Sequence, residues 1–273
     1  MSPNNDQPDW TAMGDFGMPE LEDRDHIYVL ELPFDPESQL RAIYGLLARN
    51  QKADEELAAR IREADEHAKK LTGIWNECAV EECVEMMHHS VYQDAMHSMS
   101  ALGMLAPFIE GVFAQCFASV GKKFYSAGTG PSAHSRWKSS GPEAWDIHYQ
   151  HIGGRLRKSS IVEGARELSV ETGLQKYLPA DIWTAMTALF AYRNKMFHNG
   201  MEWPEEERKN FQNRITAEHW PTTWFSQATS GGDPWVFYMT QEFIEHCYDA
   251  ANKTLDAFGL LIKNELWPLL PER

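Results

Sequence analysis

The feature that most constrains the fold is the long stretch without proline between Pro36 and Pro107. Asp35 and Pro36 suit a helix start, because an aspartate caps free amides and proline fits the first helical position. Apolar residues then recur every three or four positions over Leu40–Cys78, which is the spacing of one helix face. The sequence therefore predicts a long helix from Asp35, with Gly73 as the point where it kinks or breaks.

Helical patterns continue over most of the remaining chain. A second helical segment is predicted from about Ala79 to Val120, and its end, 101–120, is apolar on almost every side, so it belongs in a core. Residues 221–234 are predicted to be a loop and 235–239 a short strand. Further helices are indicated by their starting or stopping residues: 160–173, 181–198 with Asp181 as N-cap, a short helix opened by Pro204, and 241–267 with Thr240 as N-cap. These patterns predict an all-α helical bundle.

Composition divides the chain into three parts. Residues 1–34 contain many prolines and glycines and are predicted to be a flexible tail. Residues 35–94 are predicted to form a long helical extension, and residues 95–270 the helical bundle. Within the bundle, residues 121–159 concentrate glycine, serine and proline, which predicts a long inserted loop.

Cysteine use and hydropathy favour a cytoplasmic protein. The 4 cysteines show no CxxC spacing, which is typical of reduced thiols. The amino-terminal residues have no basic segment followed by an apolar one, so no signal peptide is predicted. No apolar run approaches the length of about 18 residues that crosses a bilayer, so we expect no membrane association.

The net charge of −15 counts against a general nucleic-acid binder, because such proteins present a basic surface. One segment departs from this balance, since 122–158 holds seven basic and two acidic residues. The basic residues are Lys122, Lys123, Arg136, Lys138, Arg155, Arg157 and Lys158. Aromatic residues are interleaved with them, a composition typical of grooves for single-stranded RNA. The alternative is a surface loop whose aromatic side chains anchor it to the core.

A second candidate site lies at the end of the predicted helix 181–198, in Arg193-Asn194-Lys195-Met196-Phe197-His198. Arg193 and His198 project about 140° apart around a helix axis, and long side chains with that separation can converge on one group. A guanidinium holds phosphate charge, and an imidazole moves a proton near neutral pH.

This motif resembles the signature of the HEPN superfamily, whose RNA-cleaving members carry Arg, a polar residue that is often Asn, and His a few positions later. The resemblance covers Arg193, Asn194 and His198, and it implies a helical bundle over about 95–266. It further implies an endoribonuclease that needs no metal and no cofactor. The RNA 2′-hydroxyl would attack the adjacent phosphate, with His198 as acid or base, Arg193 stabilising the phosphorane and Asn194 orienting the reacting groups.

The resemblance also implies partners besides RNA. In the family two motifs usually meet across a homodimer, so one chain would hold half of a site. Its members serve in conflict or stress systems, which here suggests a toxin held by an antitoxin or another regulatory protein.

The same residues have explanations without catalysis. Arg193 and His198 would stabilise the negative end of the helix dipole, and Asn199-Gly200 would supply a left-handed cap. A further alternative is a HEPN-like fold that acts only as a protein-interaction or ligand-binding module. An exposed cleft lined by Arg193 and His198 would favour catalysis, whereas burial under Trp and Phe side chains would favour these alternatives.

A possible metal site is weaker. Glu85 and His89 are one helical turn apart and could share a metal ion. The sequence carries no partner motif of known metal-site spacing and no glycine-rich phosphate loop or nucleophile elbow. We therefore predict a solvated polar face without a metal site.

Overall fold

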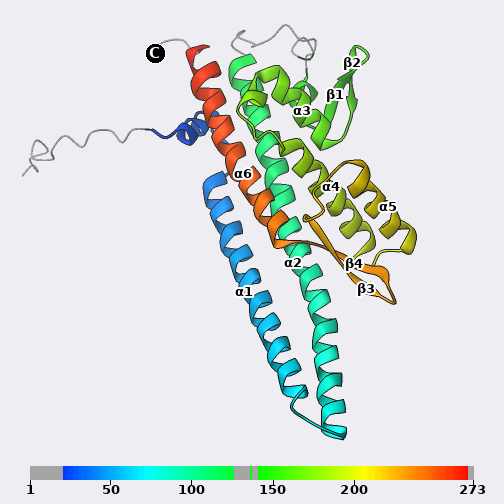
Figure 1. Ribbon diagram of the computed structural model, residues 1–273. Helices are drawn as coiled ribbons and strands as arrows, with labels where there is room; N and C mark the ends of the chain where they lie inside the picture. Colours follow the sequence, from blue (N-terminus) through cyan, green and yellow to red (C-terminus); the bar gives the residue numbers. More distant parts are fainter. Residues whose placement is uncertain (1–20, 126–135, 137–140, 270–273) are drawn as a thin grey trace, which may run out of the picture.

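The computed structural model describes residues 21–125, residue 136 and residues 141–269. These residues are mostly helical, as predicted, with two small two-stranded sheets. Helices α1 (Pro36–Ala68) and α2 (Ile74–Val120) form a long antiparallel hairpin whose far end projects from the molecule (Figure 1). The other helices and both sheets gather around the second half of α2.

Both ends of the connection between α1 and α2 follow from local chemistry. The Asp35 carboxylate accepts the Ser38 amide at 3.1 Å and caps α1. The break predicted at Gly73 is confirmed, because α1 ends at Ala68 and Gly73 takes a φ of +62° directly before α2. The second helix starts at Ile74, earlier than predicted.

The division between an extension over 35–94 and a bundle over 95–270 stays a prediction, and no break in the chain marks it. Helix α2 runs without interruption through residues 94 and 95. Its second half is buried on nearly every side, as predicted, and includes Leu102, Leu105, Phe113 and Phe117. One continuous helix thus forms the core of the bundle and one arm of the projecting hairpin.

Four further helices pack around this core. They are α3 (Ile161–Thr172), α4 (Ile182–Asn199), α5 (Glu205–Ala217) and α6 (Gln241–Leu261), which continues as short π and 3-10 turns to Leu269. The Ser160 and Thr240 hydroxyls cap α3 and α6, each accepting an amide at 3.2 Å. Asp181 occupies the N-cap position of α4 but makes no capping bond, and its carboxylate lies 3.2 Å from His246 instead.

The prediction of a flexible tail is wrong for residues 21–34. Residues Asp23–Leu30 form a 3-10 helix, η2, that packs against α6 and buries Ile27 and Leu30. Arg24 fixes it with ion pairs to Glu37 at 2.9 Å and to Asp256 at 2.6 Å. The approach is so close that a Cβ on Gly259 would lie 2.1 Å from a backbone oxygen of η2. Burial of Ile27 and Leu30 and the ion pairs of Arg24 therefore hold this segment in place, although its composition is typical of a loop.

Two antiparallel hairpins were not predicted as such. Strands β1 (Tyr149–Ile152) and β2 (Arg155–Lys158) lie inside the predicted inserted loop. Strand β3 (Phe225–Ser230) occupies the predicted loop 221–234 and pairs with β4 (Asp233–Met239), which includes the predicted strand 235–239. Each hairpin turns on a Gly-Gly pair with positive φ at both residues.

Helix α2 and its π-helical continuation, Ile74–Phe124, are long and apolar enough to cross a membrane by length and composition alone. In the structure, 56% of the most apolar window is buried inside the protein.

Candidate functional site

The motif Arg193, Asn194 and His198 lies at the surface of the last turns of α4. Asn194 and His198 are exposed, and the Arg193 side chain is 33% exposed. Phe197 lies between them in sequence and is 60% exposed. The motif therefore presents a guanidinium, an amide, an imidazole and an aromatic ring to solvent, rather than burying the charged groups under tryptophan or phenylalanine.

The end of α4 also fits the structural alternative. Gly200 takes a φ of +71°, and its amide donates to the Met196 carbonyl at 2.9 Å. The Trp203 indole donates to the Gly200 carbonyl at 2.9 Å and fixes the chain beyond the helix. The expected stop signal at Asn199-Gly200 is thus present alongside the exposed motif.

Arg193 is held by two neighbours. Its Nη1 lies 3.7 Å from Oε2 of Glu110 on α2, and its guanidinium carbon lies 5.6 Å from the centre of the Phe190 ring. The carboxylate and the ring restrict the guanidinium on two sides, so Arg193 is oriented before any ligand binds.

Glu110 also contacts a histidine that sequence reasoning missed. His148 Nε2 lies 3.3 Å from Glu110 Oε1, and His148 Nδ1 lies 2.7 Å from Asp146 Oδ1. One carboxylate therefore links the motif arginine of α4 to an imidazole just before β1. No spacing rule could have paired His148 with Arg193, because the two meet only through the fold.

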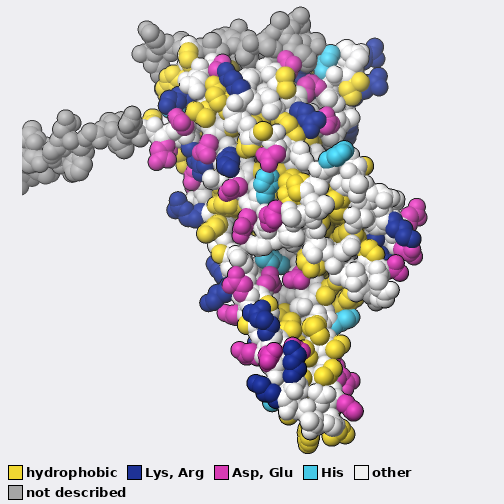
Figure 2. All heavy atoms as spheres, viewed as in Figure 1, with side chains coloured by type: hydrophobic (Ala, Val, Ile, Leu, Met, Phe, Trp, Pro, Cys, Tyr) yellow, Lys and Arg dark blue, Asp and Glu magenta, His cyan; other side chains and the backbone are white. Residues whose placement is uncertain are grey.

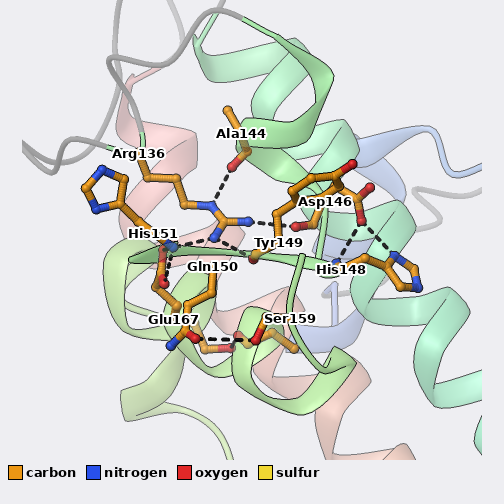
Figure 3. A network of polar contacts seen from close by, with 11 residues as sticks. Arg136, Ala144, Asp146, His148, Tyr149, Gln150, His151, Ser159 and Glu167 are labelled. Carbon is orange, nitrogen blue, oxygen red and sulfur yellow. Dashed lines mark hydrogen bonds and ion pairs between the residues drawn. The ribbon is translucent and has the colours of Figure 1, made fainter. Parts of the chain in front are cut away.

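A buried arginine holds the segment that carries His148 (Figure 3). The Arg136 guanidinium donates to the carbonyls of Ala144 and Asp146, both at 2.6 Å, and of Tyr149 at 2.8 Å. It also forms an ion pair of 2.9 Å with Glu167 of α3. Arg136 is 0% exposed, so the expectation that it contacts RNA is corrected. Its donors bind the backbone on both sides of His148.

The other predicted RNA-binding residues fall into two groups. Arg155, Arg157 and Lys158 are exposed on β2, at the hairpin that extends from the molecule (Figures 1 and 2). Lys122 is exposed at the end of α2, while Lys123 pairs with Glu31 at 2.9 Å. Lys138 lies outside the described residues.

The basic hairpin and the α4 motif are connected through His148. The Ser159 amide, which follows β2, donates to the His148 carbonyl at 2.8 Å, and Lys158 pairs with Tyr149 in the sheet. The backbone that follows β2 therefore lies next to His148, whose side chain contacts Glu110.

Aromatic residues of this segment support the anchoring alternative. Phe124 and Trp145 are buried, and Trp145 packs so closely on Gly121 that a Cβ there would lie 2.4 Å from the indole. Trp137 lies outside the described residues. The buried rings of Phe124 and Trp145 therefore hold the loop to the bundle.

The weak metal candidate gains no support. Glu85 and His89 are both exposed on α2. Among the residues that the structure describes, no three His, Cys, Asp or Glu side chains are grouped as metal ligands.

A polar cluster of a different kind lies between α1 and α2. His97 Nδ1 contacts a carboxylate oxygen of Asp54, and the Gln93 amide donates to the other at 2.8 Å. Burial, followed by repulsion from Asp54, raises the pKa of Asp94 to about 6, against a smaller opposing effect of His97. This cluster belongs to the α1–α2 contact and not to the α4 motif.

In comparisons with known proteins, the chain matches no family model, no curated protein and no solved structure. The functional conclusion therefore rests on the residues and their geometry.

Proposed function

We propose that this chain is a metal-independent endoribonuclease of the HEPN type. The observation that carries the proposal is the exposed face of α4, where Arg193, Asn194 and His198 are open to solvent. Arg193 is held by Glu110 and Phe190, so it can meet a phosphate without first losing its rotamer freedom. A preorganised guanidinium stabilises charge that develops in a transition state.

The reaction is an intramolecular transesterification. The 2′-oxygen forms a bond to phosphorus, and the bond from phosphorus to the 5′-oxygen breaks. The 2′-hydroxyl proton leaves to a base, and the departing 5′-oxygen receives a proton from an acid. His198 removes the first proton, and Arg193 neutralises the phosphorane through its forked N–H groups. Asn194 orients the phosphate by its side-chain amide.

Substrate binding uses two surfaces. Arg155, Arg157 and Lys158 supply phosphate contacts along β2, where all three are exposed. Phe197 offers an exposed ring beside the motif, on which an unpaired base can stack. The proposed substrate is therefore single-stranded RNA, and we propose that the protein acts in the cytoplasm as a homodimer under control of an antitoxin or another regulatory protein.

The test compares two histidines at the same spacing from an arginine. His198→Ala should lower the RNA cleavage rate by on the order of 10²-fold or more without changing the melting temperature, and wild-type cleavage should persist in EDTA. The control histidine is His219, which follows Arg214 by five residues. It is exposed and lies two residues beyond the end of α5. His219→Asn, which suits the positive φ of 56° there, should cleave like the wild type. Equal rates for wild type and His198→Ala would refute the proposal.

The second candidate is a non-catalytic helical protein that binds a partner. The Gly200 cap and the Arg193–Glu110 ion pair favour it, since both explain motif residues through stability alone. In that case the purified protein would leave RNA intact, and Arg193→Ala would change the melting temperature only slightly, because both partners of the ion pair are partly exposed.

A further inference from the structure

A second imidazole of the same chain, that of His148, lies on the Arg193 side of the motif, because Glu110 contacts both residues. We infer that His148 is the general acid that protonates the leaving 5′-oxygen, while His198 is the base. The inference rests on the proposed endoribonuclease function. It places both proton-transfer groups in one protomer, so catalysis would not require the partner's histidine.

The contacts of His148 carry the inference. Glu110 lies between the two cationic groups, with Oε2 3.7 Å from Arg193 Nη1 and Oε1 3.3 Å from His148 Nε2. The guanidinium and the imidazole therefore converge on one anionic group, as they would on a phosphate. His148 is 47% exposed, so a substrate can reach it from solvent.

The partners of the ring indicate which proton-transfer role it has. Nδ1 faces Asp146 at 2.7 Å, and Nε2 faces Glu110 at 3.3 Å. A carboxylate only accepts hydrogen bonds, so both contacts are satisfied together only when both ring nitrogens carry a proton. In that form Nε2 carries a proton that it can donate, while Nδ1 faces Asp146 on the other side of the ring.

Hydrogen bonds from Arg136 and to Asp146 fix the backbone around His148. Arg136 binds the carbonyls of Asp146 at 2.6 Å and Tyr149 at 2.8 Å, and the His148 amide donates to Asp146 Oδ1 at 2.8 Å. Figure 3 shows His148 on one side of this network and His151 on the other. Such a supporting shell is what a catalytic side chain needs in order to hold its orientation.

The protons balance over the two steps. His198 takes the 2′-hydroxyl proton as the 2′-oxygen attacks phosphorus. His148 gives its Nε2 proton to the 5′-oxygen as that oxygen leaves, which produces a 5′-hydroxyl and a 2′,3′-cyclic phosphate. Water later removes the proton from His198 and returns one to His148, so neither oxidant nor metal is consumed.

The experiment uses two RNA oligonucleotides that differ at one linkage. One has the ordinary 5′-oxygen, and the other has sulfur in its place, because a thiolate leaves without being protonated. On the ordinary linkage, His148→Gln should lower the cleavage rate by on the order of 10²-fold. On the sulfur linkage most of that loss should disappear, whereas His198→Ala should remain impaired on both.

The matched control is His151→Gln, which changes the same residue type in the same hairpin on the far side of Arg136 (Figure 3). It should cleave both linkages like the wild type, and the melting temperatures of all variants should agree. Ordinary RNA cleaved by His148→Gln at the wild-type rate overturns the inference. An equal loss on both linkages also overturns it, because His148 would then not protonate the leaving group. If the wild type cleaves neither linkage, the proposed function itself fails and the inference falls with it.

Discussion

Glu110 of α2 and Arg193 of α4 face each other across a helix interface with their charged atoms 3.7 Å apart. Both side chains are partly exposed, so the ion pair itself contributes little stability. Its importance is geometric, because Glu110 also contacts His148 and thereby joins the inserted segment to the motif helix. The predictions below test the surfaces and buried groups around this junction.

The exposed basic residues of β2 should control how RNA affinity depends on salt. Each phosphate contact adds about 0.7 to the slope of log affinity against log salt for a single strand. Arg155→Glu, Arg157→Glu and Lys158→Glu together should weaken binding and flatten that slope, as measured by fluorescence anisotropy with catalytically inactive His198→Ala protein. The matched control is charge reversal at Arg60, Arg62 and Lys70, which are exposed at the projecting end of the α1–α2 hairpin. An unchanged slope after reversal on β2 would show that the hairpin does not contact RNA.

Arg136 should matter for stability far more than for direct substrate contact. Its removal leaves the Glu167 carboxylate, which is only 13% exposed, with the His151 amide but without a positive charge beside it, and it takes the guanidinium donor away from three backbone carbonyls. Breaking a buried ion pair in this way costs about 3 kcal/mol or more, so Arg136→Ala should lower the urea midpoint strongly. Arg166→Ala is the control, since Arg166 pairs with a partly exposed Glu163 at 3.2 Å. Wild-type stability of Arg136→Ala would contradict the role assigned to the network.

Asp94 should make the protein less stable as the pH rises. Burial raises the pKa of Asp94 from 3.8 to about 6, so the folded state holds this proton more tightly than the unfolded state. Between about pH 4 and 6 the unfolded chain has already lost the proton, and each step upward in pH favours unfolding. The full shift corresponds to about 3 kcal/mol in the free energy of unfolding, and solvent screening of the half-buried carboxylate reduces the expected fall to about 1 to 2 kcal/mol.

The test of this pH dependence is Asp94→Asn, which removes the charge and keeps the shape. The variant should melt several degrees higher than the wild type at pH 7, and the difference should vanish below pH 4. Asp249→Asn on α6 is a control for a carboxylate that is largely exposed. If the difference in melting temperature between wild type and Asp94→Asn stays constant from pH 4 to 7, Asp94 does not titrate as described.

The proposed homodimer should have separate active sites. Light scattering at micromolar concentration should give about twice the chain mass of 31.3 kDa. If both histidines act within one chain, a mixture of His148→Gln and His198→Ala protein should stay inactive, because no heterodimer would contain an intact site. If the site is shared between chains, the mixture should regain activity. A strict monomer that cleaves RNA would remove the dimer proposal and keep the in-chain site.

Helix boundaries were predictable where the chain carries local capping chemistry. Asp35, Ser160 and Thr240 each accept an amide of the first turn, and Gly173 ends α3 with a φ of +81°. The two strand hairpins were missed although each contains a usable signal. Gly153-Gly154 and Gly231-Gly232 take positive φ at both positions, as tight hairpin turns require.

Long-range contacts could not be predicted from one sequence. Residues 21–34 resemble a tail in composition, yet a few side chains fix η2 to α6. The exposed motif on α4 was visible as a pattern, whereas His148 and Glu110 join it only after the chain has folded. The segment 122–158 contains seven basic residues, and no local signal in the sequence distinguishes Arg136, which is buried, from the others.

The buried guanidinium of Arg136 also affects how the segment that carries His148 folds and unfolds. Burial of this charge is favourable only when all of its partners are in place. The partners are the carbonyls of Ala144, Asp146 and Tyr149 and the Glu167 carboxylate on α3. We therefore expect the segment that carries His148 to close in one cooperative step. On heating it should open as one unit, and His148 would then lose its contact with Glu110.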